Sequence, residues 1–426
     1  MSILVLADDC NPDWPSLPIV GYKYALALSK IASVTVATHV RNKENIERVE
    51  PKGLRFVYLD NERIAAPIYK LAIKLRGGDE VAWSTNMIMQ YLPYLAFERE
   101  AWTTFRSELQ AGEFDIVHRI TPMSPTLPSY IASKLTCPFV IGPLNGNLHW
   151  PVQFRGEQKR ERERLRGLRA LAKHLPYSKS TFRNAALVLA GFEHTMSELR
   201  PLAPGRVVNF PEIGFDPTIF HADRERAAFS GPGPYRFLYA GRLVPYKLPE
   251  VAVRAFAEEL ELQRHSLHIV GEGPEIARLR EIVAAERLEG VVQFEGKRSQ
   301  SELATMMRSF DAFVFPSIRD LGAGVVVEAM ACGMTCVVAD YGAPGHLVDR
   351  ARGVAVPIAP ITDYVVGFRR ALMQCITDSE HAAKLAISGR DYAQDLFTWS
   401  RKAEETAIYY QNLLANKPVL DNGKYY

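Results

Sequence analysis

Two carboxylates flank a glycine-containing loop in the second half of the chain. Asp320 precedes Gly322 and Gly324, and Glu328 follows them on an expected short helix. A buried strand over residues 311–315 leads into the loop, so backbone N–H groups would point at an anion while the helix dipole adds positive potential. Carboxylates accept hydrogen bonds from sugar hydroxyls, and one carboxylate can take both hydrogens of a ribose diol. The pattern predicts a phosphate site with sugar hydroxyls beside it.

Two cations follow an earlier strand of the same half. Arg242 and Lys247 lie in the sequence AGRLVPYK, on a proline-containing loop after a strand over residues 235–240. An Arg can bind a diphosphate with a bidentate fork and a Lys as a point charge, and both can neutralise the charge that grows on a departing phosphate. Gly271 and Gly273 follow the next strand, but the third glycine of G-x-G-x-x-G is absent, so dinucleotide binding is not predicted.

The two motifs together resemble those of a known family. The first is PSIRDLGAGVVVEAMACGMTCVVADYGAP, which is similar to the acid-x7-Glu signature of retaining, nucleotide-sugar-dependent glycosyltransferases of the GT-B fold, the group 1 (family 4) enzymes. The second is AGRLVPYK, which is similar to their G-R-L-x-x-x-K-G motif. The resemblance is specific over residues 241–348 and diffuse over the first half. It departs from the usual pattern where Asp320 replaces Glu, Ala323 replaces Gly or Phe, and Leu248 replaces Gly.

The resemblance implies a donor site in the second half. Arg242 and Lys247 would bind the donor diphosphate, Glu328 would bind the ribose, and Asp320 would bind the transferred sugar. Arg242, Lys247 and Asp320 are therefore the expected catalytic residues of this half. The other expected donor contacts are Gly241, Gly271, Gly273, Gly322, Gly324 and Val325. No Asp-x-Asp follows any strand and no His/Cys cluster has ligand spacing, so we expect no metal and no cofactor beyond the donor substrate.

Short apolar runs alternate with helical patterns, which predicts an α/β fold. The alternation starts near residue 3 and restarts near residue 235, so we expect two doubly wound parallel sheets in Rossmann-like domains, which in GT-B enzymes face each other across a cleft. The expected parts are an acceptor-side domain over 1–200, a Pro/Gly-rich connection over 201–234 and a nucleotide-sugar-binding domain over 235–390. A helix over 391–415 would cross back to the first domain, and the residues after it would fray.

Two residues of the first half are further candidates. Gly21 stands at the entry of a predicted helix, where it would permit a close approach of the backbone to phosphate; a plain packing role is the alternative. His118 ends a predicted strand over 114–118, the end at which open α/β sheets contact ligands, although such a His can also be structural. In the resembled family a His contacts the transferred sugar two positions later, where this chain has Ile120. His118 is the fourth expected catalytic residue.

Residues 138–151 predict a strand that runs into a loop rich in Gly, Pro and Asn, and this stretch resembles a GPLNGG-x-x-WP segment in a subset of the same family. Asn145, Gly146 and His149 of this loop are expected to face the acceptor. Two basic amphipathic patterns, over 64–76 and 154–175, suit an anionic membrane surface or, for the second, an anionic acceptor. A packed helix with a solvated basic face is the alternative for both.

Composition restricts the compartment and the partners. The chain has 426 residues, 47% hydrophobic and 23% charged, which is typical of a globular enzyme of two domains. The net charge of +3 gives no argument for nucleic acid. Five scattered cysteines, the lack of a signal-peptide pattern and the lack of long apolar runs predict a cytoplasmic protein, with peripheral contact at the inner membrane face left open.

We therefore expect a retaining glycosyltransferase that moves a sugar from a nucleotide diphospho-sugar to a glycan or lipid-linked acceptor in cell-surface polysaccharide assembly. One alternative is another GT-B enzyme, such as a nucleotide-sugar epimerase or a phosphorylase; an epimerase would convert the donor without an acceptor. The other is a non-catalytic partner that binds sugar nucleotides without turning them over. Asp320 and Ile120, as departures from the family pattern, keep this second alternative open.

Overall fold

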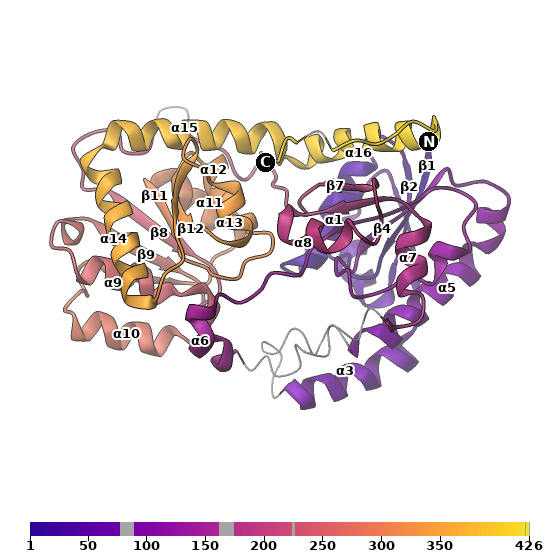
Figure 1. Ribbon diagram of the computed structural model, residues 1–426, viewed down its shortest axis with the longest axis horizontal. Coiled ribbons are helices and arrows are strands. Elements are labelled where there is room, and N and C mark those ends of the chain that lie inside the picture. Colours follow the sequence, from indigo (N-terminus) through magenta and orange to yellow (C-terminus); the bar gives the residue numbers. More distant parts are fainter. Residues whose placement is uncertain (77–88, 162–173, 224–225, 422, 426) are drawn as a thin grey trace. The chain divides into compact units, whose positions relative to one another are not determined.

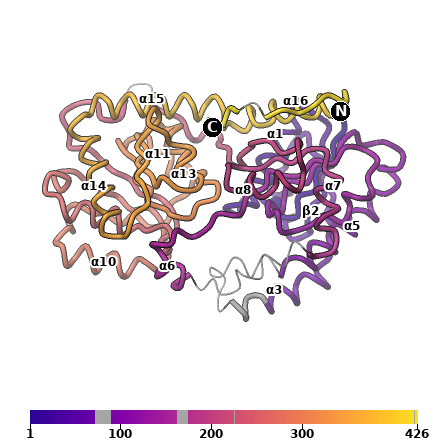
Figure 2. The backbone as a smooth tube through the Cα atoms, in the orientation of Figure 1, coloured from indigo at the N-terminus to yellow at the C-terminus, as the bar shows by residue number. Residues whose placement is uncertain are grey.

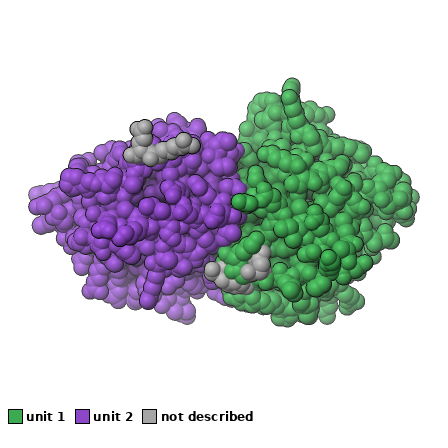
Figure 3. All heavy atoms as spheres, turned by 90° about the horizontal axis from the view of Figure 1, so that it is seen from above, with its two compact units in different colours: residues 1–147, 162–212, 399–425 green, residues 148–161, 213–398, 426 purple. Residues whose placement is uncertain are grey.

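The described chain forms two compact units. The structure is a computed structural model that describes residues 1–76, 89–161, 174–223, 226–421 and 423–425. Unit 1 contains the described residues within 1–147, 162–212 and 399–425, and unit 2 contains Leu148–Glu161 and the described residues within 213–398 (Figure 3). A segment of the first half of the chain, Leu148–Glu161, therefore belongs to unit 2, although the sequence predicts it within the first domain.

Unit 1 is built on a parallel sheet with the strand order β3-β2-β1-β4-β5-β6-β7 (Figure 1). The strands are β1 (Ser2–Ala7), β2 (Ser33–His39), β3 (Leu54–Leu59), β4 (Ile116–Thr121), β5 (Phe139–Leu144), β6 (Ala185–Ala190) and β7 (Val207–Asn209). The helices are α1 (Leu17–Leu28), α2 (Lys43–Val49), α3 (Glu62–Arg76), α5 (Tyr91–Gln110), α7 (Ser178–Asn184), α8 (Phe192–Leu199) and α16 (Trp399–Leu414). Strands β1 and β6 are largely apolar runs, because a parallel sheet is covered on both faces.

Unit 2 is built on a second parallel sheet, with the order β10-β9-β8-β11-β12-β13. The strands are β8 (Arg236–Ala240), β9 (Ser266–Val270), β10 (Val292–Gly296), β11 (Ala312–Phe315), β12 (Thr335–Ala339) and β13 (Gly353–Val356). The helices are α6 (Arg155–Arg160), α9 (Pro249–Ala257), α10 (Ile276–Ala285), α11 (Gln300–Ser309), α12 (Gly324–Ala331), α13 (Gly342–Leu347), α14 (Ile361–Thr377) and α15 (Ser379–Leu396). The strand order reverses between β8 and β11, so their carboxyl ends form the switch point at which such sheets bind ligands.

The two sheets confirm the predicted fold class, which is α/β with two doubly wound, Rossmann-like parallel sheets. The helix expected over 391–415 is interrupted, because α15 ends at Leu396 and α16 begins at Trp399. Helix α16 lies beside α1 in unit 1 (Figure 2). Tyr24 of α1 shares a hydrogen bond of 2.6 Å with Thr406 of α16.

The expectation that the end of the chain frays is wrong for the described residues. Tyr425 is only 2% exposed, and its hydroxyl donates to Glu405 Oε2 at 2.7 Å. Its ring also lies 6.2 Å from that of Phe210. The end of the chain is held because an aromatic side chain is buried there. The residues before it are mostly polar, so the sequence alone did not predict this burial.

Candidate functional site

Arg242 and Lys247 lie on the loop that leaves β8 at the switch point of unit 2. The loop closes in a turn at Pro245–Lys247, directly before α9. Arg242 Nη2 donates to Tyr246 Oη at 2.8 Å. No carboxylate in the described part of the chain pairs with Arg242. The loop thus presents a guanidinium whose charge no neighbouring acid neutralises.

Asp320 lies on the loop that leaves β11, on the other side of the switch point. Its Oδ2 atom accepts hydrogen bonds from Lys247 Nζ at 3.0 Å and from Ser317 Oγ at 2.7 Å. Both partners of the ion pair are largely buried, with side chains 11% exposed for Lys247 and 18% for Asp320. The Lys247 ammonium also lies 4.8 Å from the centre of the Phe315 ring. The cation and the acid predicted from two separate motifs are therefore direct partners.

Glu328 extends from the first turns of α12 and is partly buried. Desolvation raises the pKa of its carboxyl to about 7. Among the residues that the structure describes, none donates a hydrogen bond to this carboxyl. A carboxyl that is desolvated but unpaired is suited to accept hydrogen bonds from ligand hydroxyls, which would favour its ionised form.

Ala323 lies at the entry to α12 and has a backbone conformation that is unfavourable for alanine. Its φ of 55° and ψ of 44° lie in the left-handed region, which costs a non-glycine residue about 1–2 kcal/mol. Its methyl group is buried, and burial of one such group contributes about 0.8 kcal/mol. The neighbouring predicted contacts Gly322, Gly324 and Val325 are partly buried. Ala323 thus occupies a left-handed position that glycine would adopt without strain.

Ala323→Gly is expected to raise the unfolding midpoint by about 1–2 °C, because relief of the left-handed strain exceeds the loss of one buried methyl group. Differential scanning calorimetry measures the change. Ala329→Gly is the matched control in the same helix, since Ala329 is buried inside α12 and its substitution should lower the midpoint. A fall of equal size in both variants would contradict the strain at Ala323.

Gly271 and Gly273 allow the loops after β8 and β9 to touch backbone to backbone. A Cβ at Gly271 would lie 2.0 Å from the carbonyl oxygen of Gly241, and one at Gly273 would lie 2.4 Å from that of Leu243. Both glycines also have positive φ, of 137° and 153°. Only glycine fits such positions, so these predicted donor contacts shape the backbone beside Arg242.

The structure contradicts the prediction that His118 contacts a ligand. β4 runs over Ile116–Thr121, so His118 lies inside the strand and not at its end. Its side chain is fully buried; Nε2 donates to the carbonyl oxygen of Gly142 at 2.7 Å, and Nδ1 is paired with Tyr410 Oη. Burial lowers the pKa of the imidazole to about 4, which keeps it neutral. His118 is a structural residue that links β4, β5 and α16.

The remaining candidates of the first half are divided between the two units. Gly21 packs α1 closely, because a Cβ there would lie 2.6 Å from the carbonyl oxygen of Asp9. In unit 1, Asn145 Nδ2 donates to Glu212 Oε1 at 2.6 Å, and Gly146 N donates to Thr195 Oγ1 at 3.1 Å. His149 is exposed and belongs to unit 2. An acceptor role for these three stays a prediction.

Two contacts of the site were not predicted from the sequence. Ser317 holds Asp320, and Tyr246 holds Arg242, each through a side-chain hydroxyl. Ser317 lies three positions before Asp320, and Tyr246 lies immediately before Lys247. Their closeness in the sequence to predicted ligand contacts is the signal from which these two contacts could have been predicted.

The basic patterns are described only in part. α3 exposes Ile64, Tyr69, Leu71 and Lys70. Most of the pattern over 154–175 lies outside the described residues, as residues 162–173 do. Contact with an anionic membrane therefore stays a prediction. Within the described part of the chain, no helix is both long and apolar enough to cross a membrane.

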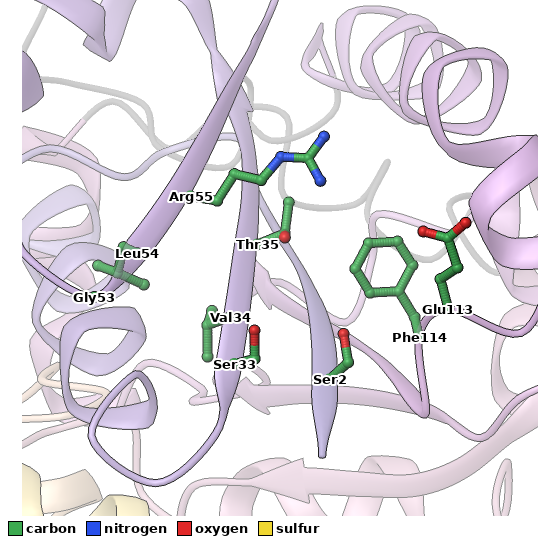
Figure 4. Close-up of a pocket in the computed structure, with 9 residues that line it drawn as sticks. All are labelled: Ser2, Ser33, Val34, Thr35, Gly53, Leu54, Arg55, Glu113 and Phe114. Carbon is green, nitrogen blue, oxygen red and sulfur yellow. The ribbon is translucent and has the colours of Figure 1, made fainter.

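A pocket in unit 1 lies apart from these residues. It has a volume of about 410 Å³ and opens where the first strands begin, with Ser2, Ser33, Arg55 and Glu113 among its lining residues (Figure 4). Parallel sheets bind ligands at the carboxyl ends of their strands, so this pocket is not the candidate site. No group of three His, Cys, Asp or Glu side chains in the described residues is placed to hold a metal, and all five cysteines are free.

Comparison with known proteins finds a family match over most of unit 2. Residues 223–392 match the family model described as "Glycosyl transferases group 1". The D-inositol 3-phosphate glycosyltransferase of Stackebrandtia nassauensis is 31% identical over 231 residues, which cover 51% of this chain and 51% of that protein. The match thus spans about half the length of this relative.

Two solved structures share the architecture of the whole chain. Sucrose-phosphate synthase from Thermosynechococcus elongatus matches this chain with a TM-score of 0.63 and 17% identity. The match covers 98% of this chain and 100% of the synthase. The Anabaena protein HepE in complex with UDP matches this chain with a TM-score of 0.62 and 16% identity. This second match covers 97% of this chain and 100% of HepE. At these identities the likeness is one of fold. Residues 223–392 of this chain are therefore similar to the group 1 glycosyltransferases, and its two Rossmann-like units have the GT-B fold.

Proposed function

We propose that the protein is a retaining glycosyltransferase that moves a sugar from a nucleotide diphospho-sugar to a glycan or lipid-linked acceptor, in the assembly of cell-surface polysaccharide. The observation that carries the proposal is the group of charges at the switch point of unit 2. Arg242 has no counter-ion in the described chain, Lys247 is paired with Asp320, and the carboxyl of Glu328 lacks a hydrogen-bond donor among the described residues. A ligand with both a diphosphate and a diol satisfies all of them.

In the proposed reaction, the bond between the anomeric carbon and the β-phosphate oxygen breaks while an acceptor oxygen bonds to that carbon from the same face. The acceptor's proton passes to the departing phosphate oxygen. Arg242 and Lys247 neutralise the negative charge that grows on the phosphate. Asp320, which loses its cation to the diphosphate, then accepts hydrogen bonds from the transferred sugar. The resemblance of the motifs to retaining enzymes supports retention, and the anomeric configuration of the product, measured by NMR, tests it.

Thermal unfolding in the presence of UDP-, GDP-, ADP- and dTDP-sugars tests the donor site. A ligand at 100 times its dissociation constant stabilises the folded state by about 2.7 kcal/mol, so one nucleotide class should raise the midpoint by about 3 °C or more. Arg242→Ala and Glu328→Ala should abolish the shift. The absence of any shift at millimolar ligand would overturn the proposal. Binding without transfer to any acceptor would favour a non-catalytic partner, and conversion of the donor alone would favour an epimerase.

A further inference from the structure

The segment Leu148–Glu161, which we call the strap, belongs to unit 2 although the chain runs from it back into unit 1. Its helix α6, drawn in magenta, lies beside helices of unit 2 in Figure 1. α6 packs on the turn at Pro245–Lys247. Leu148, Trp150 and Phe154 are buried, with 4%, 7% and 1% of their surface exposed. The strap is therefore a built part of unit 2 and not a surface loop.

One end of the strap holds the loop that carries Arg242. Arg160 forms an ion pair with both carboxylate oxygens of Glu275, and the side chain of Glu275 is only 9% exposed. The backbone N–H of Glu275 donates to the carbonyl oxygen of Leu243 at 3.0 Å. Leu243 directly follows Arg242. The ion pair therefore joins the strap to Glu275, whose backbone in turn contacts the loop that carries Arg242.

The other end of the strap holds the loop that carries Asp320. The ring of Trp150 lies 5.4 Å from the guanidinium of Arg319, which directly precedes Asp320. Leu148 packs on Gly342, where an added Cβ would lie 2.8 Å from a Leu148 methyl and 2.7 Å from the carbonyl oxygen of Asp320. Three chain segments therefore meet at the backbone of Asp320, and one of them is the strap.

The strap also contacts one further loop of the same edge and helix α14. Tyr341 Oη, after β12, donates to the carbonyl oxygen of His149 at 2.7 Å. The ring of Phe154 lies 5.7 Å from that of Tyr364, whose hydroxyl donates to the carbonyl oxygen of Pro316 at 3.2 Å. Contacts with the loops after β8, β9, β11 and β12 place the strap along the carboxyl edge of the unit 2 sheet, at which ligands bind.

We propose that the strap is a positioning element of the donor site, with Arg160 and Trp150 as its two positioning residues. Arg160 acts through Glu275 on the loop that carries Arg242. Trp150 acts through Arg319 on the loop that carries Asp320. The inference rests on the proposed donor site of unit 2. It assigns a donor role to a stretch whose sequence resembles an acceptor segment. Since a small displacement of a charged group costs much of its binding free energy, loss of either anchor should weaken donor binding more than it slows the chemical step.

Calorimetric titration with UDP, GDP, ADP and dTDP, followed by donor kinetics, tests the proposal. Arg160→Met and Trp150→Ala should each raise the dissociation constant of the preferred nucleotide and the donor KM about tenfold, with kcat changed less than about threefold. Arg160→Lys and Trp150→Phe should recover most of the affinity, because they keep the ion pair and the aromatic contact. Arg369→Met is the matched control, since it removes an ion pair of unit 2 with Glu258 that touches none of these loops.

A double-mutant cycle isolates the path through Glu275. If Arg160 acts only through this carboxylate, Arg160→Met should add nothing to the affinity loss of Glu275→Gln. Binding by both single variants within twofold of the natural protein would overturn the strap inference alone, even if their unfolding midpoints fell, because it would leave only a structural role. Failure of the natural protein to bind any of the four nucleotides would overturn the donor site, and the strap inference with it.

Discussion

Arg242→Ala is expected to weaken nucleoside diphosphate binding about 10- to 100-fold while leaving the unfolding midpoint within about 1 °C of the natural protein. A charge-assisted hydrogen bond from the guanidinium to phosphate is lost, which accounts for the affinity. Stability is unaffected because the side chain donates only to Tyr246 and neutralises no acid in the described chain. Calorimetric titration and a thermal scan of the same sample measure the two effects.

Lys247→Ala should differ from Arg242→Ala in one respect. It removes a similar share of affinity, but it also lowers the midpoint, because Asp320 keeps only the hydroxyl of Ser317 after its cation is gone. Asp320→Asn in the same background should restore the midpoint without restoring affinity. Arg390→Ala, which removes an exposed cation that pairs with Asp391, is the control for net charge. Equal midpoints and unchanged affinities in all these variants would contradict the assignment of the two cations.

The fold was predictable from the sequence because parallel strands buried on both faces leave long apolar runs. Ile3 to Ala7 of β1 and Thr335 to Ala339 of β12 are fully or nearly fully buried, as such runs require. The loops that leave these sheets were predictable for the same reason. Once the strands are placed, the carboxyl ends of β8 and β11 must meet, and the charged residues that follow them must be neighbours.

The place of His118 could not be predicted, because β4 continues through a buried Arg. Arg119 is fully buried, and its guanidinium donates to the carbonyl oxygens of Leu127, Pro122 and Ser124 at 2.6, 3.1 and 3.1 Å. A charged residue after an apolar run usually marks the end of a strand. Here backbone carbonyls of the following loop accept hydrogen bonds from both Nη atoms of Arg119, and neither the sequence nor its spacing reveals these carbonyls.

The contacts that complete the site join residues far apart in the chain. Lys247 and Asp320 are 73 positions apart, and Arg160 and Glu275 are 115 apart. The first pair was within reach of the sequence because each partner lies in a recognisable motif. The second was not, because Arg160 is one cation among many in a basic stretch and nothing local distinguishes it.

Glu328→Gln is expected to stabilise the free protein and to weaken donor binding. In the unfolded chain a glutamate ionises near pH 4.5, whereas desolvation raises the pKa of Glu328 to about 7 in the folded state. The folded state therefore holds a proton that the unfolded state has lost, and the free energy of unfolding falls as pH rises from 4.5 to 7. Gln cannot ionise, so the variant should gain about 1–3 kcal/mol at pH 8 and almost nothing at pH 4.5. Thermal scans at both pH values measure this gain.

Binding should change in the opposite direction. If a ribose diol donates to Glu328, the ionised carboxylate is the binding form, so affinity for the donor should rise with pH up to about 7 and then level off. Binding below pH 7 should release a proton, which titrations in buffers of different ionisation enthalpy would count. Glu328→Gln should lose this proton release and about 10- to 100-fold of the affinity at pH 8, because a carboxylate accepts both hydrogens more strongly than an amide oxygen.

Glu281→Gln serves as the control for both effects, since Glu281 is an exposed glutamate of α10 in the same unit and should change neither stability nor affinity. Proton release of equal size in Glu328→Gln and the natural protein would place the titrating group elsewhere. A stability gain at pH 8 with unchanged affinity would leave Glu328 as a desolvated acid that no ligand contacts. The proposal requires both results together: the free protein becomes more stable, and donor binding becomes weaker and independent of pH. Together they would show that the cost of desolvating Glu328 is retained because its carboxylate binds the ligand.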